Sequence, residues 1–255
     1  MSKLARYEAH GEIAYGVVEG DLVKQLSGPP FGDYQVTDHT HALSEAKLLA
    51  PVVPGKVVAI GLNYKSHLGD REPPKVPEPF LKATTCVIGP GDTIVIPTQA
   101  LIESEKIQEE AELSIVIGRH CKSATKANAL SYVLGYTCGN DVSARNWQGN
   151  DLQWWRAKSS DTFGPIGPVI ATDVDPGNLR ITARVNGKTV QDSNTADLLH
   201  DVPTIIEFVS RVMTLEAGDV IMTGTPGAPG DLKPGDTVDV EIEGIGVLSN
   251  PVAAE

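Results

Sequence analysis

The chain has 255 residues, 41% hydrophobic and 21% charged, which is typical of a globular protein with a substantial core. Its net charge of −12 argues against a nucleic-acid-binding surface, which would need an excess of Lys and Arg. The three cysteines are widely spaced and give no zinc-ligand pattern, and the sequence has neither a signal-peptide core nor an apolar run of membrane-spanning length. We therefore expect a cytoplasmic protein that binds neither nucleic acid nor membranes.

The first 52 residues predict a small β-rich domain. Residues 13–18 and 22–26 are strand-like and are separated by a Glu-Gly-Asp turn, which indicates a hairpin. Pro51 and the pair Pro54-Gly55 mark a boundary. We accordingly divide the chain into an N-terminal domain (1–52) and a larger domain (53–255).

The larger domain opens with a short buried-type strand, residues 56–61, which leads into a polar stretch of helical character. His67 and Asp70 are three residues apart there, so they would be neighbours on a helical turn. Residues 72–79 form a Pro-rich loop, which is either an ordinary surface loop or a lid over a site.

Residues 108–118 alternate polar and apolar residues before an apolar run, which predicts a strand entering the core. Glu110 and Glu112 are two apart, so both side chains point to the same side of that strand. Together with Asp141, which follows the apolar run 132–136, they offer three carboxylates and favour Mg²⁺ or Mn²⁺ over Zn²⁺. The alternative is a solvated strand face that binds no metal.

Residues 123–129 predict a short helix, and residues 145–165 are rich in polar and aromatic side chains. Arg145, Gln148 and Lys158 lie there beside three Trp residues. On composition alone, the charged groups could be surface residues and the Trp residues core packing.

The C-terminal third is β-rich. Residues 181–191 predict a hairpin around Asn186-Gly187, which suits a type I′ turn, and residues 202–213 predict an amphipathic helix. Further strands are expected at 220–226 and 237–242. Many strands and few helices predict a β-dominated α+β fold and not a Rossmann fold or a TIM barrel.

Six sequence strings, in this order, resemble the fumarylacetoacetate hydrolase family and together span most of the chain from about residue 56. They are Gly61-Leu62-Asn63-Tyr64-x-x-His67, Glu110-Ala111-Glu112-Leu113, Gly139-Asn140-Asp141-Val142-Ser143-Ala144-Arg145, Lys158-x-x-Asp161-Thr162-Phe163, Val185-Asn186-Gly187 and Leu215-x-x-Gly218-Asp219-Val220-Ile221-x-Thr223-Gly224-Thr225-Pro226. Each string is weak alone, and the ordered set is specific. The similarity is greatest to the acylpyruvate hydrolase and 2-hydroxyhepta-2,4-diene-1,7-dioate isomerase-like branch.

The resemblance implies a mixed β-roll as the catalytic domain, usually in a homodimer, and substrates that are 1,3-diketo or 2-keto acids. It also implies a role for each matching residue. Glu110, Glu112 and Asp141 would hold Mg²⁺ or Mn²⁺, and Lys158 would approach the substrate oxygens. Arg145 and Gln148 would line the pocket, and Thr225 would lie near the substrate carboxylate.

One departure concerns the residue three positions after His67. Many family members pair this histidine with a glutamate three residues on, whereas this chain has Asp70, whose side chain is one methylene shorter. If the pair forms, His67 is a general base toward water and Asp70 orients it. The alternative is that His67 is an exposed residue without a catalytic role.

The sequence thus favours a divalent-metal-dependent hydrolase of C–C bonds in acylpyruvates such as fumarylpyruvate or acetylpyruvate, acting through an enolate. Three alternatives stay open: a decarboxylase of an oxaloacetate-type 2-keto acid, an isomerase or tautomerase of a hydroxymuconate-like diacid, and a non-catalytic metal-binding relative.

Overall fold

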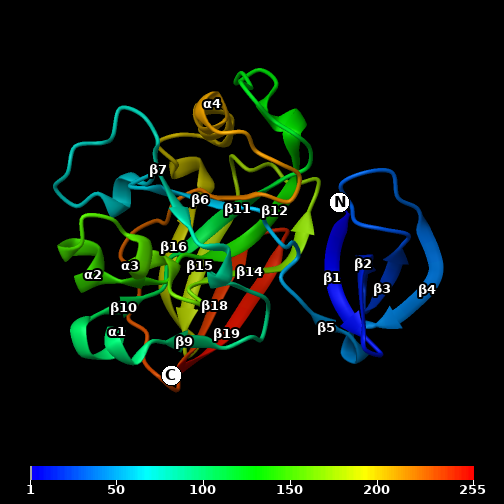
Figure 1. The fold of residues 1–255 in the computed structure, drawn as a ribbon, viewed down its shortest axis with the longest axis horizontal. Helices are drawn as coiled ribbons and strands as arrows, with labels where there is room; N and C mark the ends of the chain where they lie inside the picture. Colours follow the sequence, from blue (N-terminus) through cyan, green and yellow to red (C-terminus); the bar gives the residue numbers. More distant parts are fainter. Residues whose placement is uncertain (1) are drawn as a thin grey trace.

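The computed structural model describes residues 2–255 and divides into a small N-terminal part and a larger main body (Figure 1). The strands of the N-terminal part pair antiparallel, and its first strand continues into the main body, where Lys3 and Leu4 pair with Ala171 and Ile170. The two parts therefore share one hydrogen-bonded sheet. The N-terminal strands are β1 (Lys3–Ala9), β2 (Glu12–Glu19), β3 (Leu22–Leu26), β4 (Val36–Ala42) and β5 (Lys47–Leu48).

The main body is built on the remainder of this large sheet, in the order β14-β12-β11-β17-β6-β7. Every residue of its central strand β11 is buried, because strands flank it on both sides and side chains cover both faces. The strands are β6 (Val57–Gly61), β7 (Glu78–Lys82), β8 (Val87–Ile88), β11 (Ala111–Ile117), β12 (Val133–Asn140), β14 (Gly164–Ala171) and β17 (Val220–Met222).

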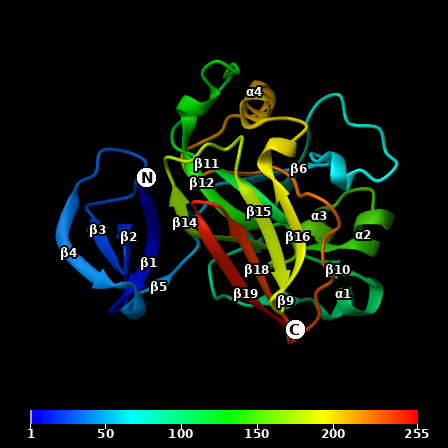
Figure 2. The ribbon, with the colours of Figure 1, turned by 180° about the vertical axis from the view of Figure 1, so that it is seen from behind.

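A second sheet, in the order β16-β15-β18-β19-β9, covers one face of the first (Figure 2). Leu113 and Ile115 of β11 belong to the same hydrophobic cluster as Ile181, Val240 and Leu248 of this sheet, so the core lies between the two layers. The strands are β9 (Ile94–Ile96), β15 (Arg180–Val185), β16 (Lys188–Asn194), β18 (Thr237–Ile242) and β19 (Gly246–Ala254), and a separate pair is formed by β10 (Ile107–Gln108) and β13 (Ser143–Ala144). The predicted Asn186-Gly187 hairpin is present as β15 and β16.

Helices are few and mostly short. The α-helices are α1 (Thr98–Glu103), α2 (Arg145–Asn150), α3 (Trp155–Ser159) and α4 (Val202–Val212), and the 3-10 turns are η1 (Leu43–Glu45), η2 (Lys65–His67), η3 (Thr84–Cys86), η4 (Ala129–Tyr132) and η5 (Thr195–Asp197). The amphipathic helix predicted at 202–213 matches α4. Within residues 2–255, no helix has the length and apolar character needed to cross a membrane.

The helix predicted at 123–129 is wrong. Ser123 has a positive φ of 54°, and its N–H donates to the Ser210 carbonyl at 2.9 Å. The next N–H, that of Ala124, donates to the Ser210 hydroxyl at 3.0 Å. The segment therefore docks on α4 through these backbone donors and does not form a helix of its own.

The strand directions bring four segments to one end of the large sheet. β6 and β17 are parallel, so their C-terminal ends lie side by side, and the antiparallel strand β11 begins at the same end. β12 ends opposite the start of β11, with Asn140 paired to Ala111. The loops after β6, β12 and β17 and the residues before β11 therefore converge, on the side of the body away from the N-terminal part (Figure 1).

Candidate active site

Three carboxylates meet at this end of the sheet. Glu110, Glu112 and Asp141 each offer an oxygen, and these oxygens all lie within 4.8 Å of one another. The backbone fixes the arrangement, because the Asp141 N–H donates to the Glu110 carbonyl at 3.0 Å and the Glu110 N–H donates to the Asn140 side chain at 3.0 Å. All three carboxylate side chains are buried. The structure thus brings together the three acids that the sequence singled out.

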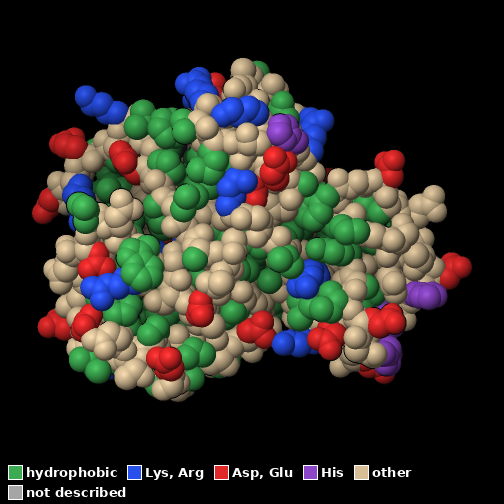
Figure 3. All heavy atoms as spheres, viewed as in Figure 1, with side chains coloured by type: hydrophobic (Ala, Val, Ile, Leu, Met, Phe, Trp, Pro, Cys, Tyr) green, Lys and Arg blue, Asp and Glu red, His purple; other side chains and the backbone are tan. Residues whose placement is uncertain are grey.

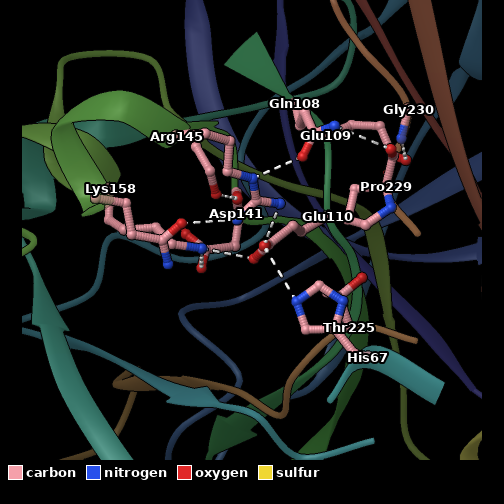
Figure 4. Close-up of polar contacts among 12 residues, drawn as sticks. His67, Gln108, Glu109, Glu110, Asp141, Arg145, Lys158, Thr225, Pro229 and Gly230 are labelled. Atoms are coloured by element: carbon pink, nitrogen blue, oxygen red, sulfur yellow. Dashed lines mark hydrogen bonds and ion pairs between the residues drawn. The ribbon is translucent and has the colours of Figure 1, made fainter. Parts of the chain in front are cut away.

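Three cationic side chains surround the cluster, and two of them, Arg145 and Lys158, are labelled in Figure 4. The Lys158 ammonium lies 2.6 Å from Glu110 Oε2 and 2.7 Å from Asp141 Oδ2. The Lys82 ammonium lies 2.5 Å from Asp141 Oδ1, and the Arg145 guanidinium lies 2.7 Å from Glu110 Oε1. Glu110 and Asp141 therefore each contact two cations, whereas no cation pairs with Glu112 among the residues described.

The pKa values of the two glutamates diverge for this reason. Burial alone would raise the pKa of Glu110, but Lys158, Arg145 and His67 together lower it to about 2. Burial raises the pKa of Glu112 well above its ordinary value, and the negative charges of Asp141 and Glu110 raise it further. Glu112 is therefore the carboxylate of the three whose ionised form the protein stabilises least.

The donor set fits a divalent cation. Glu110, Glu112 and Asp141 supply hard oxygen ligands, which Mg²⁺ and Mn²⁺ prefer. The Glu112 carboxylate is also held in place, because the Gly224 N–H donates to its Oε2 at 2.7 Å. A cation bound here would relieve the mutual repulsion that raises the pKa of Glu112.

His67, the last residue of η2, points toward the cluster (Figure 4). Its Nδ1 lies 2.7 Å from the Gly227 carbonyl, which can only accept, so Nδ1 carries the proton. When the ring is neutral, its lone pair is on Nε2, which lies 3.9 Å from Glu110 Oε1. His67 thus presents a basic nitrogen to the carboxylate cluster.

Asp70 is not brought into this site. It is exposed, and the orienting contact of His67 is made by Gly227. The helical turn that would make His67 and Asp70 neighbours ends at Leu68, and Gly69 then adopts a positive φ of 59°. In this structure a backbone carbonyl takes the orienting role that the sequence analysis gave to Asp70.

Arg145 and Gln148 lie together on α2 at the wall of the site. Arg145 donates from Nε to the side-chain oxygen of Gln108 at 2.7 Å and from Nη1 to the side-chain oxygen of Gln148 at 2.8 Å. Arg145 therefore makes two hydrogen bonds and one ion pair, the latter from Nη2 to Glu110. Its guanidinium is held as part of the wall.

Thr225, also predicted from the sequence, lies in the loop after β17 and lines the site. Gln191 of β16 holds it in place: the Gln191 amide nitrogen donates to Thr225 Oγ1 at 2.9 Å and also to the Pro226 carbonyl. The Gln191 carbonyl oxygen accepts from the Ala111 N–H at 3.0 Å, between the two glutamates. One buried amide therefore joins the metal-ligand strand to the Thr225 loop.

Lys82 and Gln191 are two site residues that sequence reasoning missed. Lys82 is 3% exposed and also donates to the carbonyls of Lys158 and Phe163, so it anchors the C-terminal end of α3. In the sequence it follows a short apolar stretch and looks like a surface lysine. Gln191 lies in the predicted hairpin among other polar residues, and only its burial in the structure distinguishes it from them.

These groups line a cavity of about 480 Å³. The carboxylate cluster and Lys158 occupy its polar side, and the rings of Phe80 and Trp154, 5.2 Å apart, form an apolar wall. His67 and Arg71 also line it. The cavity therefore combines a charged centre with an apolar surface suited to a short carbon chain.

Comparison with known proteins identifies the family. Residues 56–253 match the model described as fumarylacetoacetate (FAA) hydrolase C-terminal, and residues 2–51 match the model described as Rv2993c-like, N-terminal. The first match covers well over half of the chain and contains every residue of the cluster.

Individual relatives agree with this assignment. A 5-carboxymethyl-2-hydroxymuconate delta-isomerase from Mycobacterium smegmatis is 44% identical, covers 99% of this chain and 100% of its own, and superposes with a TM-score of 0.93. An oxaloacetate tautomerase, FAHD2A, from Bos taurus is 38% identical over 98% of this chain and 79% of its own length. A maleylpyruvate hydrolase from Sphingobium sp. SYK-6, solved with manganese(II) and pyruvate, is 30% identical, with 99% of both chains covered and a TM-score of 0.82. The β-dominated fold expected from the sequence is confirmed, and the chain belongs to the fumarylacetoacetate hydrolase family, whose members are enzymes.

Proposed function

We propose that the protein catalyses a divalent-metal-dependent proton transfer on a 2-keto acid, a keto–enol tautomerisation or a double-bond isomerisation. The observation that carries the proposal is the geometry of His67. Its Nδ1–H is bonded to the Gly227 carbonyl and its free Nε2 faces the carboxylate cluster, so it can accept a proton and return it.

The chain's own residues have distinct roles in this reaction. Glu110, Glu112 and Asp141 would hold Mg²⁺ or Mn²⁺, and the bound ion would supply a Lewis acid for the keto group of the substrate. Thr225 binds the substrate carboxylate. His67 takes a proton from the carbon beside the keto group and returns it to the oxygen or to a different carbon. Lys158 stabilises the negative charge that develops on the oxygen.

Two relatives support this choice of reaction, since the Mycobacterium smegmatis protein is named a delta-isomerase and the Bos taurus protein an oxaloacetate tautomerase. The position of Asp70 supports it as well. Hydrolysis needs an activated water, and the carboxylate expected to strengthen His67 for that task lies outside the site.

Hydrolysis of an acylpyruvate such as fumarylpyruvate or acetylpyruvate is the second candidate. It begins with the same polarised keto acid, and the maleylpyruvate hydrolase with bound manganese(II) and pyruvate is a relative along the whole chain. In this version His67 removes a proton from water, the resulting hydroxide attacks the distal carbonyl, and the C–C bond between that carbonyl and the pyruvate unit breaks. Lys158 stabilises the pyruvate enolate that departs.

One set of assays separates these functions. Oxaloacetate, acetylpyruvate and fumarylpyruvate are each followed by ultraviolet absorbance with Mg²⁺, with Mn²⁺ and with a chelator, and the products are identified by chromatography. We expect metal-dependent acceleration of oxaloacetate tautomerisation that His67→Gln abolishes. Cleavage of the acylpyruvates would favour the hydrolase, and loss of CO₂ from oxaloacetate the decarboxylase. No metal-dependent turnover of any of the three would contradict the proposal.

A further inference from the structure

The cavity extends from the carboxylate cluster to a rim formed by the segment that follows His67. Arg71 lies on this segment and lines the cavity. Two other Lys or Arg side chains line it, and both are already bonded: Lys158 to Glu110 and Asp141, and Arg145 to Glu110. Within residues 2–255, the Arg71 guanidinium has neither a hydrogen bond nor an ion pair with the protein.

The segment that carries Arg71 is anchored on both sides. Leu68, which precedes it, is only 5% exposed, and the Arg71 N–H donates to the Leu68 carbonyl at 3.2 Å across the left-handed Gly69. On the far side, His200 Nε2 donates to the Pro74 carbonyl at 3.1 Å. These contacts keep Arg71 at the rim of the cavity.

We infer that Arg71 binds a second carboxylate at the far end of the substrate, so that the protein selects 2-keto dicarboxylates over 2-keto monocarboxylates. The inference rests on the proposed function, which places the 2-keto acid end at the carboxylate cluster and Thr225. A guanidinium without a protein partner matches a carboxylate in charge and in its forked geometry. Phe80 and Trp154 supply an apolar wall for the carbon chain that joins the two ends.

The wall residue Arg145 cannot serve the same purpose as readily, because Gln108 and Gln148 already accept hydrogen bonds from its Nε and Nη1, and its buried Nη2 is paired in charge with Glu110. Lys158 is similarly committed to the cluster. Arg71 is therefore the cavity cation that can bind an anion without giving up an existing contact.

The test compares acids that differ only at the far end. Binding of 2-oxoglutarate and 2-oxopentanoate, and of 2-oxoadipate and 2-oxohexanoate, is measured by calorimetry with Mg²⁺-loaded protein. The variant is Arg71→Gln. The matched control is Lys75→Gln, which removes an exposed positive charge from the same segment at a position outside the cavity lining.

We expect the wild-type protein to bind at least one dicarboxylate about tenfold or more tightly than its monocarboxylate counterpart, as a charge-assisted hydrogen bond would give. Arg71→Gln should remove this preference while leaving the monocarboxylates within about twofold, and Lys75→Gln should leave the preference intact. Equal binding of both acids by the wild-type protein, or an unchanged preference in Arg71→Gln, would overturn the inference. Metal-dependent binding of neither class would instead contradict the proposed function.

Discussion

Lys158 contacts two of the three clustered carboxylates, and it is 2% exposed. A buried ammonium in this position stabilises negative charge strongly, because little water screens it. Its contribution should be greatest when charge develops on the substrate oxygen.

The variant Lys158→Met should therefore lower kcat about a hundredfold and change KM much less. Steady-state kinetics on the best substrate checks this, with the exposed Lys188→Met as the control. An unchanged kcat would remove Lys158 from the chemistry.

Glu112 offers a test of the metal site that is independent of activity. Glu112→Gln keeps an oxygen for the Gly224 N–H but removes one charge from a crowded group. The protein without metal should be as stable as the wild type or more so, while the rise in Tm on adding Mg²⁺ should be largely lost. Differential scanning fluorimetry with Glu105→Gln as control measures both effects, and a full Mg²⁺ response in Glu112→Gln would exclude this residue as a ligand.

For single residues, the sequence identified the side chains that take part in the chemistry more readily than the groups that position those side chains. Glu110, Glu112, Asp141 and His67 belong to recognisable strings, and the structure brings them together. The Gly227 carbonyl could not be predicted, because a backbone group has no sequence signature and its place depends on a loop some 160 residues away. Lys82 and Gln191 were missed for a similar reason, since burial is a property of the assembled sheet.

Among the elements, η2 shows the limit of reading spacing as structure. A separation of three residues predicts neighbours only if a helix continues, and here one 3-10 turn ends at Leu68. Longer elements were predicted better: the apolar period of 202–213 and the Asn-Gly turn of β15 and β16 both depend on local chemistry.

Helix α4 owes its start to Asp201. The Thr204 N–H donates to the Asp201 carboxylate at 2.9 Å. The Thr204 hydroxyl donates to the same carboxylate. Burial alone would raise the pKa of Asp201, but these hydrogen bonds outweigh it and lower the pKa below its ordinary value. The cap is therefore fully effective above the ordinary pKa of Asp and is lost as the pH falls through the lowered value.

Removing the cap with Asp201→Ala should cost about 1 kcal/mol of unfolding free energy at neutral pH. Asp201→Asn should retain most of that stability and lose the pH dependence contributed by this group. Urea unfolding of the three proteins at neutral and at acidic pH tests both statements. Equal stability of the Ala variant and the wild type at neutral pH would show that the cap is not needed.

For the whole molecule, the link between the N-terminal part and the main body matters most. The sequence predicted two domains, and the structure joins them through the pairing of β1 with β14. The surface shows both parts with acidic side chains spread over the visible face (Figure 3). We propose that the two parts unfold together despite their separate cores.

Val23→Ala tests this coupling. Val23 is fully buried among Tyr7 and Ala9 of the N-terminal part, so its truncation should cost about 1–3 kcal/mol. All three Trp residues lie in the main body, at positions 147, 154 and 155. A Trp-detected urea midpoint that shifts with Val23→Ala supports cooperative unfolding, and an unchanged midpoint contradicts it. The exposed Val212→Ala should have little effect.

The homodimer implied by the resemblance is likewise a proposal for the whole molecule. Light scattering on the purified chain at several concentrations measures the mass directly. A monomer mass of 27.1 kDa throughout would contradict it.

The parallel pairing of β6 with β17 also bears on how the protein is made. The two strands are separated by some 160 residues of chain, and the site depends on groups that follow both of them. A ribosome releases the N-terminal part and the acidic strand long before it releases the Thr225 loop, so the nascent chain carries its carboxylates without their enclosing wall. Contacts this distant in sequence form slowly. Metal ions should therefore bind late, to the assembled sheet, and should not accelerate its formation when the unfolded chain is diluted from denaturant.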